Sequence, residues 1–309
     1  MEIANLWANA DGGINNVRIA CREDAQAITS LLRRAAYAHL HADWHYPSDW
    51  LGSSGFVVLE SEVDDQADRS LASRLFGAKP QLQACLAVAS DPPPAAWVRV
   101  AAVAKSAGSP RILAALFASV IDYLHQEGVT KLGWLQVESW PEEWLRDLGF
   151  QIENFVETYV KQDVDIFAAK EMSGLVIRPV QEVDLPLLER IEADAFEPLW
   201  RHSVTSLTLA WRHALSFDVA ALNDEVVGYQ FSTPVESGAH LARVTVAPFF
   251  QGSGVGTRLL AHAFEGYRRR GLNMISLNTQ ADNSASKKLY QRFGFRPNGQ
   301  RFPVWAVDL

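Results

Sequence analysis

The amino-acid sequence predicts an α/β protein made of two tandem units, each a mixed sheet with helices on both faces. The chain has 309 residues, about twice the ~150 residues of a typical domain. Each half opens with a short strand followed by a helix, and one further helix occurs in both halves, 143 residues apart (116 and 259). Alternation of strands and helices is typical of a sheet covered by helices on both faces.

The first elements of the two halves match each other. We expect a strand at 17–20 and a helix at 23–38, then a strand at 174–178 and a helix at 183–196. The repeated helix is expected at 111–126, where apolar residues spaced by three and four form one buried face. Its apolar residues are Leu113, Leu116, Phe117, Val120, Ile121 and Leu124, and the last five are matched 143 positions later by Leu259, Leu260, Ala263, Phe264 and Tyr267.

The second part of each half repeats as well. A strand follows each copy of the helix, at 131–137 and 274–278, and the next helix ends in Leu148-Gly149-Phe150 or Phe293-Gly294-Phe295. Both glycines stand where a left-handed cap residue is favoured. Closing strands are expected at 151–161 and 301–307. The segment 165–173 is short and polar, which predicts a linker and two domains at 14–168 and 173–309.

Composition excludes several classes of protein. Hydrophobic residues make up 48% and charged residues 21% of the chain, as in soluble globular proteins. Two cysteines, Cys21 and Cys85, exclude a disulfide framework. We find neither a basic start with an apolar core, as in a signal peptide, nor an apolar run of ~18 residues. These patterns predict a soluble cytoplasmic protein that does not contact membranes.

Charge is shared unevenly between the halves. Residues 1–172 carry 14 basic and 23 acidic residues, whereas residues 173–309 carry 14 and 13. Within the second half, residues 251–301 hold nine basic residues and two acids, which favours a small polyphosphate ligand. The overall charge of −8 argues against a nucleic-acid partner. The acidic segment 60–68 and the run Asp91-Pro92-Pro93-Pro94 are predicted loops.

A glycine-rich loop leads from a β-branched strand into the second copy of the repeated helix. It runs from Val244 through Gln251-Gly252-Ser253-Gly254-Val255-Gly256-Thr257. Glycines let successive N–H groups point into one concavity, and a helix N-terminus adds a positive dipole, so the loop suits a pyrophosphate. The spacing differs from both the Walker loop and the dinucleotide fingerprint.

A second motif follows at 283–295, where Asn283 is a natural N-cap for the next helix. Together the two segments resemble the GCN5-related N-acetyltransferase (GNAT) superfamily. Gln251, Gly254 and Gly256 match its Arg/Gln-x-x-Gly-x-Gly/Ala loop. Asn283, Leu289, Tyr290, Gly294 and Phe295 match its Asn-x-x-Ala-x-x-Leu-Tyr-x-x-x-Gly-Phe helix, with Ser286 in place of the usual Ala. Motifs support the resemblance over residues 174–309, and only the layout supports it over 17–162.

The resemblance implies two tandem GNAT-like domains with mostly antiparallel sheets, acetyl-CoA as co-substrate and no metal. In the family the pyrophosphate lies on the glycine loop, and the pantetheine arm pairs with the preceding strand, here 242–247. The implied cofactor residues are Val244, Thr245, Val246, Gln251, Gly252, Ser253, Gly254, Val255, Gly256, Thr257, Asn283, Ser286 and Tyr290.

The resemblance also implies direct attack of an amine on the thioester. Tyr290 is the expected general acid, because a neutral phenol can protonate the leaving thiolate. Glu197, Glu236 and His240 are candidate bases for the amine proton, beside a chain of water molecules.

The first half lacks the residues that carry this chemistry. With the offsets of 143 and 145, Gln251, Gly254 and Gly256 correspond to Gly108, Arg111 and Leu113, and Tyr290 corresponds to Leu145. This pattern predicts a degenerate domain that keeps the fold. Its seven tryptophans are interpreted as core, and the alternative is that some fill a lost cofactor cleft or line a groove for the acceptor. His41 and His45, four apart, would share one face of a helix, but they have no clear partner ligand for a metal.

The predicted function is an acetyl-CoA-dependent N-acetyltransferase that acts on a primary amine of a small molecule or peptide. Two alternatives stay open: a CoA-binding sensor or scaffold without turnover, and a transferase that uses a longer acyl-CoA. The sequence does not define the acceptor, the oligomeric state or the part that the first half plays in the acceptor site.

Overall fold

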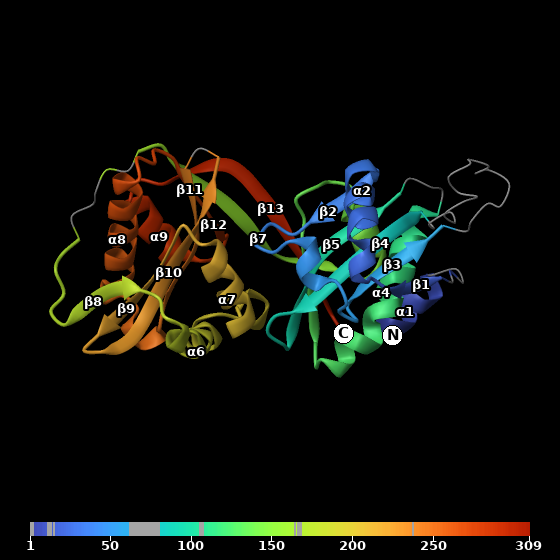
Figure 1. The fold of residues 1–309 in the computed structure, drawn as a ribbon, viewed down its shortest axis with the longest axis horizontal. Helices are drawn as coiled ribbons and strands as arrows, with labels where there is room; N and C mark the ends of the chain where they lie inside the picture. Colours follow the sequence, from blue (N-terminus) through green and yellow to red (C-terminus); the bar gives the residue numbers. More distant parts are fainter. Residues whose placement is uncertain are drawn as a thin grey trace. The chain divides into compact units, whose positions relative to one another are not determined.

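The computed structural model describes residues 3–10, 14, 16–61, 81–104, 108–163, 165, 169–236 and 238–309. Contacts divide the chain into two compact units (Figure 1). Unit 1 consists of Met1–Ile152 and Trp305–Leu309, and unit 2 of Glu153–Val304. None of the helices in the described ranges has the length and apolar character needed to span a bilayer.

Unit 1 is a sheet with helices on both faces. Its strand order is β1-β3-β4-β5-β6-β13, and β2 pairs with β5. Alternate residues of β3 and β4 pack against α4 on one face and α2 on the other. Its elements are α1 (Ile3–Ala10), β1 (Val17–Ile19), η1 (Arg22–Asp24), α2 (Ala25–Arg34), β2 (Tyr37–Leu40), η2 (Pro47–Trp50), β3 (Phe56–Glu60), β4 (Leu82–Ser90), β5 (Ala95–Val103), α4 (Ser109–Gln126), β6 (Lys131–Leu135) and α5 (Glu142–Asp147).

Unit 2 has the same layout, with the strand order β13-β7-β12-β11-β10-β9-β8. Figure 1 shows α8 on one side of this sheet and α6 with α7 on the other. Its elements are β7 (Gln151–Lys161), β8 (Leu175–Pro179), η3 (Glu182–Asp184), α6 (Leu185–Ala195), η4 (Pro198–Trp200), α7 (Val204–His213), β9 (Ser216–Leu222), β10 (Glu225–Val235), β11 (Gly238–Val246), η5 (Pro248–Phe250), α8 (Val255–Arg269), β12 (Ile275–Gln280), α9 (Ser284–Arg292) and β13 (Arg296–Asp308).

Both units open with the same polar motif. The Arg18 guanidinium donates two hydrogen bonds to Asp24, at 2.7 and 2.9 Å. Arg178 bonds Asp184 in the same way, at 2.7 and 2.8 Å. Each aspartate also accepts a hydrogen bond from a backbone N–H three residues earlier. The two motifs are 160 residues apart (24 and 184) and align α2 with α6.

Two expectations from the sequence need correction. The helix expected at 23–38 ends at Arg34, and Tyr37–Leu40 form strand β2. The reason is packing, since Tyr37 lies against Trp140 and Trp144, with ring centroids 5.6 and 4.7 Å apart. The strand expected at 131–137 ends at Leu135. The run 91–94 is a loop between β4 and β5 as expected, whereas most of the acidic segment 60–68 lies outside the described residues.

Each unit is completed by a strand from the other half of the sequence. From Glu153 onward, β7 belongs to unit 2, where it pairs antiparallel with β12 from Val156↔Gln280 to Lys161↔Ile275. The end of β13 belongs to unit 1, where the Trp305 indole N–H donates a buried hydrogen bond of 2.6 Å to Gln136. The compact units therefore differ from the division at 168–173 expected from the sequence repeat.

Because the end of β13 belongs to unit 1, we expect Trp305 to stabilise the unit that contains the first half of the sequence. Trp305 is 2% exposed, so we expect Trp305→Ala to destabilise unit 1 by about 3–5 kcal/mol. Hydrogen exchange should show faster exchange in α4 and β5, with α8 of unit 2 unchanged. Trp211→Ala is the control, because Trp211 is 39% exposed. If only unit 2 lost protection, the assignment of Trp305 to unit 1 would be contradicted.

Candidate functional site

A cavity of unit 2 lies along β11 where this strand no longer pairs with β12. β11 and β12 pair only from Ala239↔Ile275 to Leu241↔Leu277. In the β10–β11 ladder, Ser232 faces Leu241 and Phe231 faces Arg243, so Ala242 is an extra residue that forms a β-bulge. Bulges bend a strand and increase its twist. Beyond the bulge, a cavity of about 390 Å³ is lined by β11, the glycine loop and α9.

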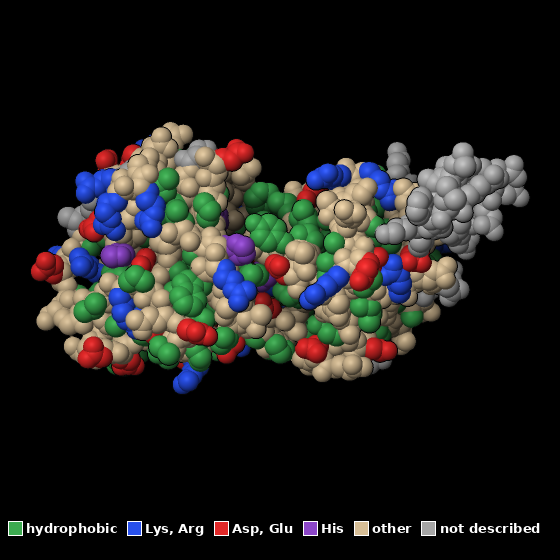
Figure 2. All heavy atoms as spheres, in the orientation of Figure 1, with side chains coloured by type: hydrophobic (Ala, Val, Ile, Leu, Met, Phe, Trp, Pro, Cys, Tyr) green, Lys and Arg blue, Asp and Glu red, His purple; other side chains and the backbone are tan. Residues whose placement is uncertain are grey.

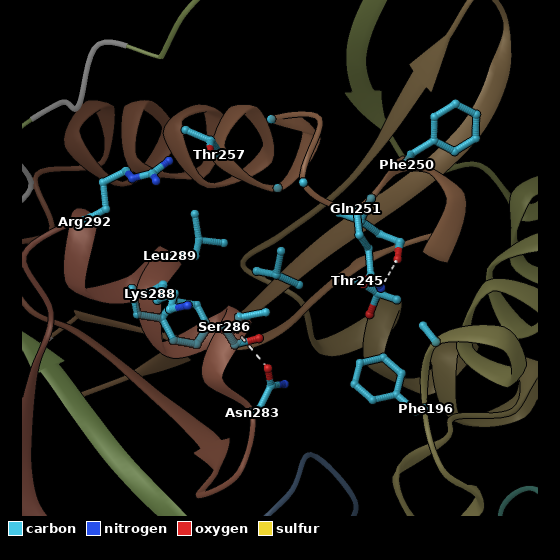
Figure 3. A pocket seen from close by; sticks show the side chains of 18 residues that line it. Phe196, Thr245, Phe250, Gln251, Thr257, Asn283, Ser286, Lys288, Leu289 and Arg292 are labelled. Atoms are coloured by element: carbon cyan, nitrogen blue, oxygen red, sulfur yellow. Dashed lines mark hydrogen bonds between the residues drawn. The ribbon is translucent and has the colours of Figure 1, made fainter.

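The wall of this cavity is built by the end of α6, β11, η5 with the glycine loop, the start of α8, and α9 (Figure 3). Figure 3 shows Leu289, Ser286 and Asn283 on one side, and Thr245, Gln251 and Phe196 on the other. The lining residues are Ala195, Phe196, Val244, Thr245, Val246, Phe250, Gln251, Gly252, Gly254, Gly256, Thr257, Asn283, Ala285, Ser286, Lys288, Leu289, Tyr290 and Arg292.

The glycine loop turns the chain from β11 into α8. Gly254 is the N-cap of α8 and has φ +105°, a left-handed conformation that glycine adopts without a steric penalty. Gly252 has φ +75°. The first N–H groups of α8 have no partner within the helix, and they carry the positive end of its dipole. The loop and helix therefore give the cavity an anion-binding end.

The second wall is α9, which begins at a side-chain cap. The Asn283 Oδ1 accepts a hydrogen bond of 3.0 Å from the Ser286 backbone N–H. Lys288 and Arg292, one turn apart on α9, also line the cavity and add positive charge. Figure 2 shows further Lys and Arg side chains on the surface of unit 2, over α8.

Tyr290 lies in the wall of the cavity and is 6% exposed. Burial raises the pKa of Tyr290 above its usual value, and a hydrogen bond with Ser286 and the charge of Arg243 oppose this in part. The phenol is therefore protonated at neutral pH and can donate a proton.

The cavity brings together most residues that the sequence singled out for the cofactor. Ser253 and Val255 do not line it: the Ser253 hydroxyl donates to the Phe250 carbonyl, and Val255 is buried beside Leu259. The Gln251 side-chain N–H donates to the Val246 carbonyl at 3.1 Å.

The three candidate bases do not line the cavity. Glu197 is exposed and precedes η4, and Glu236 is exposed in the turn between β10 and β11. His240 lies on β11, with its Nδ1 2.9 Å from the Ser276 hydroxyl. Burial lowers the pKa of His240 to about 4, so the imidazole is neutral at pH 7.

Sequence reasoning missed a buried polar network beside the cavity. The Glu192 carboxylate, which is 0% exposed, accepts hydrogen bonds from Tyr229 (2.8 Å), Thr245 (2.8 Å) and Arg243. Arg243 forms an ion pair with it. One signal was present in the sequence, since Glu192 stands four residues after Leu188 on the apolar face of α6.

In unit 1, the corresponding parallel strands β5 and β6 also part, but strand β2 pairs with β5 beyond that point. β5 and β6 pair only from Ala95↔Lys131 to Trp97↔Gly133. Further along β5, β2 pairs antiparallel from Leu40↔Val100 to Tyr37↔Val103. Since β4 pairs with the other edge of β5, β2 occupies the edge that β6 leaves.

The tryptophans of unit 1 serve two purposes. Trp7 and Trp134 are fully buried in the core. Trp140 packs on Tyr37 and donates a hydrogen bond of 3.0 Å to the Ala38 carbonyl, so it helps to hold β2 in the gap. Core packing is therefore observed for Trp7 and Trp134, and Trp140 contacts strand β2.

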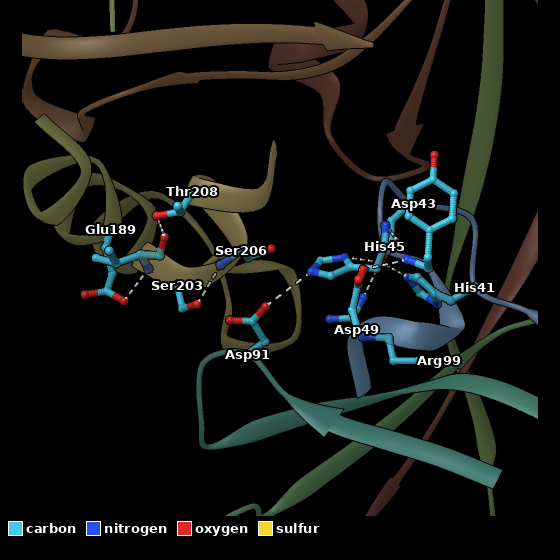
Figure 4. A network of polar contacts seen from close by, with 12 residues as sticks. His41, Asp43, His45, Asp49, Asp91, Arg99, Glu189, Ser203, Ser206 and Thr208 are labelled. Atoms are coloured by element: carbon cyan, nitrogen blue, oxygen red, sulfur yellow. Dashed lines mark hydrogen bonds and ion pairs between the residues drawn. The ribbon is translucent and has the colours of Figure 1, made fainter. Parts of the chain in front are cut away.

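His41 and His45 lie in a loop after β2 and not on a helix. Figure 4 shows them with Asp43, Asp91 and Arg99. Asp43 forms an ion pair with Arg99 and lies 3.2 Å from His45. Among the described residues, no group of three or more His, Cys, Asp or Glu side chains is arranged to hold a metal ion.

The fold and the cavity define the class of protein, a transferase of the N-acetyltransferase type. The sequence model of the Acetyltransferase (GNAT) family matches residues 185–295. The [ribosomal protein bS18]-alanine N-acetyltransferase of Salmonella typhimurium is 30% identical over 112 residues, 36% of this chain and 74% of that protein. N-alpha-acetyltransferase 30 of Schizosaccharomyces pombe is 27% identical over 114 residues, 35% and 75% of the two chains. The chain belongs to the GNAT family.

Solved structures agree on the fold of the whole chain. A GCN5-related N-acetyltransferase from Sphaerobacter thermophilus has a TM-score of 0.58 at 16% identity, over 94% of this chain and 95% of that one. One from Kribbella flavida has a TM-score of 0.61 at 11% identity, over 95% and 70%. The two-unit layout is thus shared beyond the stretch that the family model matches.

The buried His240 should make unit 2 sensitive to acid. The unfolded chain binds a proton at this histidine near its ordinary pKa of about 6.5, whereas the folded chain does so only near 4. Its contribution to stability is therefore lost as the pH falls from 6.5 to 4. In urea unfolding, His240→Asn should cost more stability at pH 7 than at pH 5. An equal cost at the two pH values would contradict a depressed pKa.

Proposed function

We propose that unit 2 binds acetyl-CoA in the cavity lined by β11, the glycine loop and α9, and transfers the acetyl group to a primary amine of a peptide or small molecule. One observation carries this proposal: the anion-binding loop before α8, the free edge of β11 and the Tyr290 phenol all belong to one cavity. The loop would hold the pyrophosphate, with Lys288 and Arg292 available to further phosphate oxygens.

The reaction needs no covalent enzyme intermediate. The neutral amine nitrogen attacks the thioester carbonyl carbon and forms the C–N bond, after which the C–S bond breaks. The thiolate takes the proton of the Tyr290 phenol, and Tyr290 is reprotonated from solvent. The amine loses its proton to water, since Glu197, Glu236 and His240 do not line the cavity.

A peptide acceptor is favoured over a small molecule by the relatives. The two relatives described above are named for acetylation of alanine in a ribosomal protein and for N-alpha acetylation. Their named activities support a free α-amine as the acceptor here.

Unit 1 is proposed to be a degenerate copy that binds no cofactor. Arg111 and Leu113 stand where unit 2 has glycines, and the buried Leu145 stands at the position of Tyr290. Strand β2 occupies the edge of β5 that would pair with a pantetheine arm. One acetyl-CoA per chain is the consequence.

The proposal is tested by calorimetric titration of acetyl-CoA into the full chain. We expect one site per chain, and we expect Gly254→Leu to abolish it, because a leucine at φ +105° distorts the loop and blocks approach to its N–H groups. Gly271→Leu is the matched control, since Gly271 has φ +70° at the end of α8 with open space around it. Two sites, or no binding at all, would contradict the proposal.

Tyr290→Phe tests the chemistry separately from binding. We expect thiol release to fall about 10²-fold, with the Kd for acetyl-CoA changed less than threefold, because the ring and its packing are kept. The acceptor would be a hexapeptide with a free N-terminal alanine, with its N-acetylated form as the control. Unchanged thiol release would exclude Tyr290 as the acid.

Two further results would favour the alternatives. If the wild-type chain binds acetyl-CoA but releases no thiol with any peptide or small amine, it acts as a CoA sensor. Faster turnover with succinyl-CoA or a longer acyl-CoA would identify another acyl donor.

A further inference from the structure

The buried Glu192–Arg243 pair lies between the cofactor strand and the segment after α6. Arg243 follows the bulge on β11, and Glu192 is on α6. The guanidinium of Arg243 reaches the segment at two points: it donates to the Trp200 carbonyl at 2.6 Å, and its Cζ lies 3.6 Å from the centroid of the Phe196 ring.

This segment forms part of the cavity wall and is closed on itself. Phe196 lines the cavity. The Arg201 Nε donates a hydrogen bond of 2.8 Å to the Phe196 carbonyl, and the Trp200 N–H donates to the Glu197 carbonyl at 2.9 Å. Arg243 is thus the side chain that joins both ends of the segment to β11.

Unit 1 shows that the fold does not need this pair. By the alignment of Asp24 with Asp184, Glu192 corresponds to Leu32. By the bulges in the two ladders, Arg243 corresponds to Val100. Thr245 and Tyr229 correspond to Ala102 and Cys85, which are buried with Val100 in an apolar cluster against α2.

Removing two charges from water costs free energy, and apolar replacements of a buried ion pair are often neutral or stabilising. In unit 1, apolar side chains fill the positions that correspond to this ion pair. The charged solution in unit 2 therefore points to a role other than folding.

The segment after α6 and the corresponding segment after α2 have different secondary structures. With the offset of 160, Glu197–Trp200 of unit 2 correspond to Tyr37–Leu40 of unit 1. In unit 1, this segment is strand β2 on the edge of β5. In unit 2 it is the short helix η4 beside the cavity.

We propose that Glu192 and Arg243 are positioning residues that hold the segment 196–201 beside the cavity as the wall on the acceptor side. Glu192 fixes the guanidinium, and the guanidinium fixes Phe196 and the Trp200 carbonyl. The proposal rests on the transferase function of unit 2 and adds to it the structure that orients the amine.

The double variant Glu192→Leu/Arg243→Met tests this directly, because it removes both charges and keeps apolar bulk as unit 1 does. The first measurement is hydrogen exchange of the Trp200 and Arg201 amides, which does not depend on activity. We expect at least tenfold faster exchange at these amides and unchanged exchange in α8. Unchanged rates at Trp200 and Arg201 would overturn the proposal.

The second measurement is kinetic, with the N-terminal alanine hexapeptide as the probe. We expect kcat/KM for the peptide to fall at least tenfold, while the Kd for acetyl-CoA by calorimetry changes less than threefold. Arg243→Lys should restore part of kcat/KM, since it keeps the charge but not the planar fork. Unchanged kcat/KM, or a loss of acetyl-CoA binding as large as the loss of kcat/KM, would contradict a role on the acceptor side.

Single substitution separates positioning from stability. Glu192→Leu alone leaves Arg243 buried without its partner, so its melting temperature should fall well below that of the double variant. If the wild-type chain acetylates no amine, the transferase proposal fails, and the exchange measurement still decides whether the pair holds the segment.

Discussion

The parting of two parallel strands after three paired residues is the constraint on which the rest of the protein depends. In both units a β-bulge in the preceding ladder accompanies it, at Arg99 in β5 and at Ala242 in β11. A parted pair leaves the edge of one strand without its ladder, and unpaired buried N–H and C=O groups are costly. That edge therefore needs a hydrogen-bond partner. Unit 1 provides its own strand β2, whereas in unit 2 the strand borders a cavity of about 390 Å³.

The contrast between the units extends from the gap to the packing around it. Beside the filled gap, the face toward α2 is apolar, with Val100 and Ala102 on β5. Beside the open cavity, the same face carries Arg243 and Thr245 bonded to Glu192. Two copies of one fold in one chain thus provide a comparison in which the architecture is constant and the chemistry differs. On the face toward α6, unit 2 buries an ion pair beside the cavity, whereas the matching face of unit 1 toward α2 is apolar.

Much of this organisation could be predicted from the sequence, because it depends on local patterns. The repeated helix, the glycine at its N-terminus and the Asn283 cap each leave a signal within a few residues. The features that could not be predicted depend on contacts far apart in sequence. Tyr37–Leu40 continue a helical pattern and become a strand only because Trp140, about a hundred residues later, packs against them. The position of Glu192 on the apolar face of α6 indicates burial, but its partner Arg243 lies 51 residues later on β11 and could not be predicted.

The strands shared between the two halves of the sequence have a consequence for how the chain can be cut. Unit 1 includes Trp305–Leu309, so a fragment that holds only the first half of the sequence lacks residues that belong to unit 1. Unit 2 includes Glu153–Lys161, so a fragment that starts at the linker lacks the strand that covers β12. Neither half of the sequence thus contains all the residues of a compact unit, and separating the halves would leave both units incomplete.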